Sequence, residues 1–242
     1  MIEHKSKENL NRREFLKRST IAAAAIGAGL NVRPLYAARK KQALIGKGKK
    51  VIVFDLDGTI VKLAADWHSL RKVLNARYRE KYKEKSHFHR MSNLLSDIVA
   101  RGDEEELRHN FSIMQKYENE NITKNEPNED VIYFITNKEL FGVNSTVKLA
   151  VFSLNTKPTI IKSLQIAGVV NKFEFCVGRE DVRAWKPNPE GLLKIREHFQ
   201  VLKEDMIFFG DLKMDLLAGA NAGVESYIID DLINFIKKVR KN

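Results

Sequence analysis

One stretch constrains the fold of this chain more than any other: residues 51–59, which read VIVFDLDGT. Its first four residues are β-branched or aromatic, and an apolar run without a polar break predicts a parallel strand that is buried on both faces. Gly58 then supplies the backbone freedom for a sharp exit from the strand. We therefore expect Asp55 and Asp57 at the carboxyl end of a central strand, where open α/β sheets bind their ligands.

Further apolar runs have the same character, and helix-favouring segments separate them. Strands are expected at 148–155, which ends in a hydroxyl and an amide, and at 173–177, 206–209 and 225–229. Helices are expected at 157–168, from 189 onward and at 231–241. Strands that alternate with helices predict an α/β fold built on a doubly wound, Rossmann-like parallel sheet.

No clear strand is predicted between residues 62 and 125. This segment is rich in charge and favours helices at 66–85, 93–100 and 104–120. In the last of these, Leu107, Phe111, Met114 and Tyr117 recur at helical spacing, which predicts a packing face. After Pro127, a helix with Asn128 as its N-cap and a strand over 131–135 remain as two alternatives.

The composition excludes several classes of protein. A chain of 242 residues that is 43% hydrophobic and 30% charged suits one globular domain with an insertion, or two small domains. The net charge is +11, but lysine and arginine are scattered among acidic residues, and no basic stretch with interleaved aromatic residues indicates nucleic-acid binding. No apolar run approaches the roughly 20 residues of a membrane-spanning helix.

The cysteine and histidine residues predict neither a disulfide nor a metal site. Cys176 is the only cysteine, so no internal disulfide can form, and its place in an apolar run predicts a buried structural thiol. His87 and His89 flank Phe88 without a carboxylate or cysteine cluster at ligand spacing. We therefore expect no metal at this pair.

The first 38 residues resemble a twin-arginine export signal. Arg12 and Arg13 are followed by Glu-Phe-Leu-Lys, then by the apolar segment 21–30, and then by small residues near Ala37 and Ala38. The resemblance implies recognition by the export machinery, a periplasmic location, and cleavage near Ala37 or Ala38 or retention as an anchor. We exclude residues 1–38 from the fold and expect no stable transmembrane span unless the leader remains uncleaved.

Four segments at the strand ends resemble, in order, the motifs of the haloacid dehalogenase (HAD) superfamily, which consists mostly of magnesium-dependent phosphatases. They are Asp-x-Asp-Gly-Thr at 55–59, Ser153 after an apolar strand, Lys-Pro-Asn-Pro at 186–189, and Gly-Asp-x-x-x-Asp at 210–215. In the third, Asn188 is expected to be a helix N-cap, with Pro189 at the first helical position. The resemblance implies a core at 39–61 and 126–242 and a helical cap at 62–125 that selects the substrate.

The resemblance also implies roles for the residues of these motifs. Asp55 is expected to be the nucleophile that forms an aspartyl-phosphate. Asp57 is expected to protonate the leaving group and then to activate water. Ser153 and Lys186 are expected to bind the phosphoryl group and to steady its charge. An acidic residue at position 57 favours phosphoryl transfer over dehalogenation.

Charge argues for a cation at this site. Unit like charges ~4 Å apart repel by about 4 kcal/mol at an effective dielectric of about 20, and a phosphate dianion must approach several carboxylates. Clustered carboxylate oxygens suit Mg²⁺, which keeps waters and bridges to phosphate. The expected ligands are Asp55, Asp57, Asp211 and Asp215.

Gly58, Thr59 and Asn155 are expected to contact the substrate. Many relatives have the hydroxyl and amide of the second motif adjacent, whereas Leu154 separates Ser153 from Asn155 here. The predicted activity is Mg²⁺-dependent hydrolysis of a small phosphomonoester. Two alternatives remain open: a phosphomutase with the same core residues, and a non-catalytic exported binding protein that keeps the scaffold.

Overall fold

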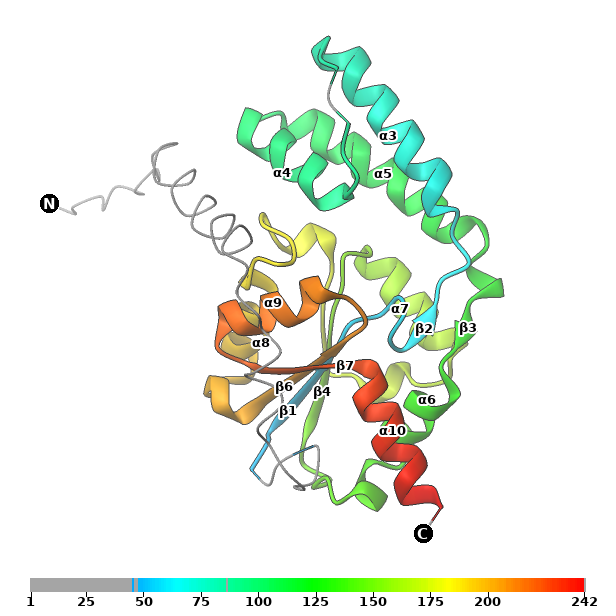
Figure 1. The fold of residues 1–242 in the computed structure, drawn as a ribbon, viewed down its shortest axis with the longest axis vertical. Coiled ribbons are helices and arrows are strands. Elements are labelled where there is room, and N and C mark those ends of the chain that lie inside the picture. The colour runs from blue at the N-terminus through cyan, green and yellow to red at the C-terminus, as the bar shows by residue number, and fades with distance from the viewer. Residues whose placement is uncertain (1–44, 46–47, 86, 242) are drawn as a thin grey trace, which may run out of the picture. The chain divides into compact units, whose positions relative to one another are not determined.

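The computed structural model describes residues 45, 48–85 and 87–241. The predicted export leader, with its paired arginines and its cleavage site, lies outside the described residues. The described chain forms a parallel sheet in the order β5-β4-β1-β6-β7 (Figure 1). The strands are β1 (Val51–Phe54), β4 (Lys148–Phe152), β5 (Phe175–Val177), β6 (Met206–Gly210) and β7 (Glu225–Ile228).

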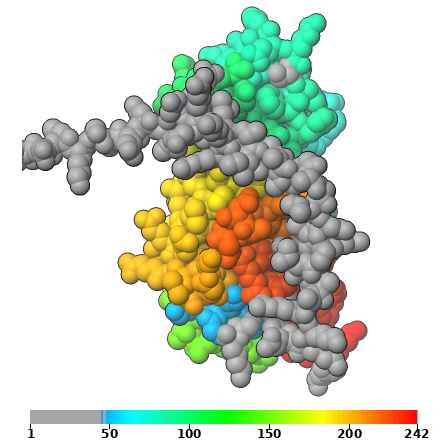
Figure 2. Space-filling model, turned by 60° about the vertical axis from the view of Figure 1, so that its left-hand side comes forward, coloured from blue at the N-terminus to red at the C-terminus, as the bar shows by residue number. Residues whose placement is uncertain are grey.

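Helices cover both faces of the sheet, because the side chains of each strand alternate between the faces. In β1, Ile52 and Phe54 pack on one face and Val51 and Val53 on the other. The first face carries α6 (Glu129–Thr136), α7 (Lys157–Ile166) and α10 (Ile229–Arg240), and the second carries α8 (Glu190–Phe199) and α9 (Lys213–Ala222). Figure 2 shows α8 in amber beside α9 in orange. This architecture confirms the predicted α/β fold class.

A two-stranded ribbon carries the chain out of the core and back. β2 (Val61–Lys62) pairs antiparallel with β3 (Glu126–Pro127). The described residues between them form α3 (Trp67–Tyr82), α4 (Met91–Arg101) and α5 (Glu104–Glu120), followed by the 3-10 turn η1 (Ile122–Lys124). Because both ends of this segment pass through one ribbon, the helices form an insertion into the α/β core.

α9 approaches β7 closely because small residues line its packing face. Ala218 and Ala222 are buried, and a Cβ on Gly219 would collide with the side chain of Ser226 in β7. Asp215 lies in the first turn of the same helix. The packing of α9 therefore determines where Asp215 lies relative to the sheet.

Predictions for two helices differ from the structure. The alternative strand over 131–135 is wrong: the residues form α6, and the Asn128 side chain caps it by accepting a hydrogen bond from Val131 N at 3.4 Å. At α8, Pro189 is the N-cap and not the first helical residue. The Asn188 side chain still accepts from Glu190 N, at 3.0 Å, so Asn188 binds the amino end of α8 although the helix begins one residue later than predicted.

Cys176 is partly exposed, whereas the sequence predicts a buried thiol. The residue belongs to β5, which lies at the edge of the sheet and has a neighbouring strand on one side only. Partial burial still raises the pKa of the thiol to about 11. The thiol is therefore protonated and a poor nucleophile near neutral pH.

Candidate active site

Three neighbouring strands end in the polar residues that the sequence singles out. Asp55 follows β1, Ser153 follows β4, and Asp211 follows β6. Lys186 comes from the segment after β5, and Asp215 from the first turn of α9. Parallel strands bring their carboxyl ends to one edge of the sheet, so residues that are far apart in the chain meet there.

Lys186 is the centre of the site. Its Nζ lies 3.0 Å from Asp55 Oδ1 and 2.7 Å from Asp215 Oδ1, and 2% of its side chain is exposed. The ammonium also lies over the rings of Phe152 and Phe208, at 4.7 and 5.2 Å from their centroids. Burial alone would lower the pKa of Lys186, but the Asp215 and Asp55 carboxylates raise it above its ordinary value. The lysine therefore remains charged.

The carboxylates carry more negative charge than Lys186 compensates. Burial raises the pKa of Asp55, Asp57 and Asp211 to about 6 each. The Asp215 carboxylate contributes to this rise at Asp55 and Asp211. Lys186 lowers the pKa of Asp55 without offsetting these effects. A bound cation would relieve this excess of negative charge.

A hard divalent cation fits the donor set. Asp55, Asp211 and Asp215 each offer a carboxylate oxygen, and these atoms lie within 4.8 Å of one another. Asp211 Oδ1 is buried without a hydrogen-bond partner among the described residues, which costs about 1–3 kcal/mol unless another group satisfies the atom. An all-oxygen carboxylate site of this kind suits Mg²⁺. Asp57, which the sequence pattern places among the ligands, is not a member of this group.

Asp57 is held by the chain that enters the insertion. Its Oδ1 accepts a hydrogen bond from Leu63 N at 2.8 Å. The side chain of Trp67, the first residue of α3, also donates a hydrogen bond to Asp57. Burial raises the pKa of Asp57, and these two hydrogen bonds offset part of the rise. Asp57 is thus linked to the entry of the insertion, whereas Asp55 is held by Lys186 in the core.

Gly58 and Thr59 shape the turn that follows β1. Gly58 has a φ of +74°, and a Cβ there would collide with the Asp211 carboxylate. Gly58 N donates to Val61 O at 2.8 Å, and Thr59 N donates to Leu56 O at 3.2 Å. Thr59 is also fully buried. The sequence predicts that both residues contact the substrate, but the structure uses their N–H groups inside the turn.

Ser153 and Asn155 lie together despite the intervening Leu154. Ser153 Oγ donates to Asn155 Oδ1 at 2.9 Å, and Asn155 N donates to Ser153 Oγ at 3.3 Å. Both residues are buried. Ser153 N is bound to Val177 O of β5 at 3.0 Å. These contacts hold a hydroxyl and an amide at the end of β4, the strand beside β1.

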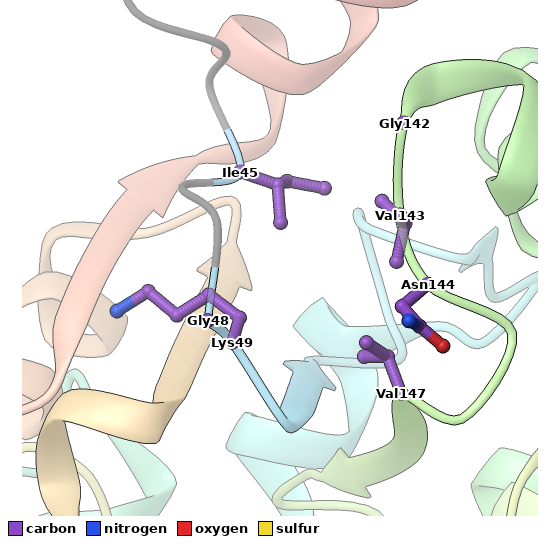
Figure 3. A pocket seen from close by; sticks show the side chains of 7 residues that line it. All are labelled: Ile45, Gly48, Lys49, Gly142, Val143, Asn144 and Val147. Atoms are coloured by element: carbon purple, nitrogen blue, oxygen red, sulfur yellow. The ribbon is translucent and has the colours of Figure 1, made fainter.

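The pocket in Figure 3 lies beside the amino ends of the strands, whereas the candidate active site lies at their carboxyl ends. It has a volume of about 230 Å³, and its lining includes Lys49, just before β1, and Val147, just before β4. Because β1 and β4 are parallel, residues that precede these strands lie a full strand length from Asp55 and Ser153. The pocket is therefore not part of the candidate active site.

Two residues that the sequence motifs do not include, Glu118 and Arg179, form a buried ion pair between the insertion and the core. Glu118 is buried on α5 together with Leu107 and Met114. A glutamate in the apolar stripe of a helix is the sequence signal for such a pair, because charged residues are almost never fully buried without a partner.

The sequence matches known hydrolases over most of its length. Residues 52–229 match the family model of the haloacid dehalogenase-like hydrolases. The chain is 31% identical over 180 residues to the pyrophosphatase PpaX of Halalkalibacterium halodurans, and the match covers 74% of this chain and 82% of the relative. A pyrophosphatase PpaX of Bacillus cereus is 25% identical over 176 residues, with 72% and 80% covered.

Two solved structures share the fold. A haloacid dehalogenase-like hydrolase from Bacteroides fragilis has a TM-score of 0.51 at 19% identity, and the match covers 74% of this chain and 86% of that chain. A predicted phosphoglycolate phosphatase from Haemophilus somnus has a TM-score of 0.50 at 18% identity, with 75% and 84% covered. At these identities the likeness concerns the fold alone.

The amino-terminal segment matches a different family. Residues 2–37 match the model described as "Ubiquitinol-cytochrome C reductase Fe-S subunit TAT signal". This match confirms the predicted twin-arginine leader. Among the helices that the structure describes, none is long and apolar enough to cross a membrane.

Proposed function

The chain belongs to the haloacid dehalogenase-like hydrolases, and we propose that it is a Mg²⁺-dependent phosphohydrolase that works through an aspartyl-phosphate on Asp55. One observation carries the proposal: at the end of β1, Lys186 Nζ lies 3.0 Å from Asp55 Oδ1 and 2.7 Å from Asp215 Oδ1. Beside them, Asp211 keeps a buried oxygen without a partner in the described chain. A buried ammonium among clustered carboxylates suits the transfer of an anionic phosphoryl group.

We assign the attack on phosphorus to Asp55 Oδ2. The other oxygen, Oδ1, accepts a hydrogen bond from Leu56 N at 2.7 Å and lies 3.0 Å from Lys186 Nζ. These contacts fix the rotation of the carboxylate, which reduces the reorganisation that the attack requires. The new oxygen–phosphorus bond forms as the bond to the leaving group breaks, and the product is an acyl phosphate on Asp55.

We assign the proton transfers to Asp57 alone. Burial raises its pKa to about 6, so a protonated fraction is present near neutral pH. In the first step, Asp57 gives its proton to the oxygen of the leaving group. In the second step, its carboxylate takes a proton from the water that attacks the acyl phosphate, and inorganic phosphate is released.

Ser153, Asn155 and Lys186 are the groups that we assign to the phosphoryl oxygens. The Ser153 hydroxyl and the Asn155 amide are held together at 2.9 Å, and Lys186 supplies positive charge. Asp55, Asp211 and Asp215 would hold Mg²⁺. When bound, Mg²⁺ reduces the negative charge that the phosphoryl group presents to an attacking carboxylate.

For the substrate we propose a small phosphorylated molecule. Inorganic pyrophosphate is the first compound to test, because the relatives at 31% and 25% identity are named pyrophosphatases. We assign the core to residues 39–61 and 126–242 and the cap to residues 62–125. A helical insertion next to the catalytic strand end suits a lid that excludes water and selects the substrate.

Hydrolysis by the purified full-length protein tests this proposal. Phosphate release from an aryl phosphate and from pyrophosphate is measured in excess chelator and again after excess Mg²⁺ is added. We expect activity to disappear and then to return, and Asp211→Asn to require more Mg²⁺ for half-maximal rate. Full activity in excess chelator contradicts the metal requirement. Phosphate that stays on an organic product would indicate a mutase instead.

We also propose that the protein is exported through the twin-arginine machinery and acts in the periplasm, which the match of residues 2–37 supports. Replacing Arg12 and Arg13 by lysine should leave the protein in the cytoplasmic fraction. Equal export of this variant contradicts the route. For the unchanged protein, the mass of the exported chain determines whether cleavage occurs near Ala37 or Ala38.

A further inference from the structure

One line of side chains on α5 meets the segment that leads to Lys186. The residues of this line are spaced seven positions apart, which puts them on one face of an α-helix. Each contacts a residue of 179–185, after β5. The pairs are Glu104 with Arg183, Phe111 with Trp185, and Glu118 with Arg179.

The two ion pairs of this line differ in burial. The side chains of Arg183 and Glu104 are 62% and 51% exposed, and an exposed pair stabilises a protein little. Those of Arg179 and Glu118 are 1% and 0% exposed. Removal of one partner from a buried pair leaves an uncompensated charge in the interior. Glu118 therefore fixes the carboxyl end of α5 to the core far more strongly than Glu104 fixes its amino end.

Glu118 also binds the amino end of α7. Its Oε2 accepts hydrogen bonds from Thr156 N and Thr156 Oγ1, both at 3.2 Å, and from Thr159 Oγ1 at 2.9 Å. Thr156 is the N-cap of α7, but its own side chain makes no capping bond. A helix amino end favours a negative charge. The Glu118 carboxylate thus holds the N-cap residue and the first turn of α7, while Glu180 Oε1 accepts from Lys157 N, the first helical N–H group, at 2.8 Å.

Two of the partners of Glu118, Thr156 and Arg179, are tied to residues that we assign to phosphoryl binding. Thr156 follows Asn155 in the chain, and Arg179 N donates to Asn155 O at 2.9 Å. Arg179 O accepts a hydrogen bond from Trp185 Nε1 at 3.0 Å, and Trp185 directly precedes Lys186. One carboxylate from the insertion therefore holds the backbone beside Asn155 and, through Arg179, the backbone beside Lys186.

We propose that Glu118 is a positioning residue, which couples the docking of α5 on the core to the placement of Asn155 and Lys186. This inference rests on the proposed function, because it concerns the same site. Without the Glu118 carboxylate, Arg179 Nη2 loses its partner, while Nε and Nη1 have no hydrogen-bond partner among the described residues even when Glu118 is present. The amino end of α7 and the segment before Lys186 then relax together, while every reacting group is still present.

The test compares Glu118→Gln with Glu104→Gln in the full-length protein. The two glutamates lie on the same helix and in the same line, and each pairs with an arginine, but only Glu118 is buried. With an aryl phosphate and saturating Mg²⁺, Glu118→Gln should lower kcat by about ten- to a hundredfold, the range expected for misplaced catalytic groups. Inhibition by inorganic phosphate should weaken in the same variant. Glu104→Gln should stay within about twofold of the unchanged protein.

Hydrogen exchange gives a second readout that does not depend on catalysis. In Glu118→Gln, backbone amides in 153–159 and 178–186 should exchange faster than in the unchanged protein and in Glu104→Gln. Unchanged exchange in both segments overturns the proposal, whatever the protein hydrolyses. Faster exchange with an unchanged kcat also overturns it, because Glu118 would then only stabilise the fold. If the unchanged protein neither hydrolyses nor binds phosphate, the proposed function fails first, and the catalytic part of this inference fails with it.

A second variant covers the case in which Glu118→Gln does not fold. The double variant Glu118→Leu/Arg179→Met removes both charges from the interior, a replacement that proteins with buried ion pairs often tolerate. The proposal predicts a lowered kcat for this folded variant, because Thr156 and Thr159 have lost their acceptor. A folded double variant with the kcat of the unchanged protein overturns the proposal.

Discussion

Two glycines let the carboxylates of the site approach one another. A Cβ on Gly58 would collide with the carboxylate of Asp211, and a Cβ on Gly210 would collide with Asp215. The turn after β1 and the end of β6 can therefore come close enough for Asp55, Asp211 and Asp215 to share one cation. The cation site therefore depends on the absence of a side chain at Gly58 and Gly210 as well as on the charge of the carboxylates.

Gly58→Ala tests this close approach, with Gly168→Ala as its matched control. Gly58 and Gly168 have φ values of +74° and +72°, so alanine at either should cost about 1–2 kcal/mol of unfolding free energy. A Cβ on Gly168 meets nothing within 4 Å. Only Gly58→Ala should also weaken Mg²⁺ binding and lower the rate of hydrolysis, measured by Mg²⁺ titration of the activity. Equal Mg²⁺ affinity in the two variants contradicts the account.

The sequence indicates the residues that follow strands better than those that pair between the helical insertion and the core. Asp55, Ser153 and Asp211 were predictable because each ends an apolar run, and parallel strands end at one edge. The pair of Glu118 and Arg179 was not predicted. The place of Glu118 in the apolar stripe of α5 indicates a buried partner, but local sequence does not indicate that Arg179 is this partner.

At the scale of elements, α9 combines two tasks. It carries Asp215, and it packs on β7 through Gly219, where a Cβ would collide with the Ser226 side chain and come within 3.2 Å of Val224 O. A small shift of this helix would move Asp215 relative to Lys186, which lies 2.7 Å from it. The small residues of α9 are therefore part of the geometry of the site.

Gly219→Ala should destabilise the protein, although alanine is favoured over glycine within a helix by about 1 kcal/mol. Overpacking against Ser226 should cost about 1–3 kcal/mol, so we expect a net loss of up to about 2 kcal/mol. Denaturant unfolding measures the change, and the added substitution Ser226→Gly should restore part of the stability. A Gly219→Ala protein that is more stable than the unchanged chain would show that a Cβ at position 219 fits between α9 and β7 without a clash.

Element type was easier to predict than element ends. The helix predicted at 104–120 has the bounds of α5, because Asp103 caps it and its apolar residues repeat at helical spacing. The short apolar run at 131–135 fits a helix and a strand equally, and only the Asn128 cap distinguishes them. The strand predicted at 173–177 is shorter, Phe175–Val177, because β5 at the sheet edge pairs with β4 alone.

For the molecule as a whole, the acidic site makes stability depend on pH and on a cation. Burial raises the pKa of Asp55, Asp57 and Asp211 from an ordinary 3.8 to about 6 in the folded chain. Between these values the folded chain binds more protons than the unfolded chain. The free energy of unfolding of the ion-free protein should therefore fall as pH rises from about 4 to about 7.

Mg²⁺ should consequently raise the Tm more at about pH 7 than at about pH 5, because it binds the ionised carboxylates and stabilises the state that it binds. Thermal unfolding with Mg²⁺ and with chelator, at both pH values, measures this difference. Asp211→Asn should abolish most of the Mg²⁺ effect at either pH. An equal gain in Tm at both pH values would mean that the ion binds elsewhere.

The central claim is that Asp55 carries the phosphoryl group during turnover, and rapid quenching of the Asp57→Asn variant tests it most directly. Loss of the base should slow release of the acyl phosphate by about 10²–10⁴-fold, while an activated aryl phosphate, whose leaving group hardly needs a proton, still reacts in the first step. We predict a burst of aryl alcohol and a phosphoryl group that peptide mapping locates on Asp55. Label on any other residue, or full activity in Asp55→Asn, would contradict the account.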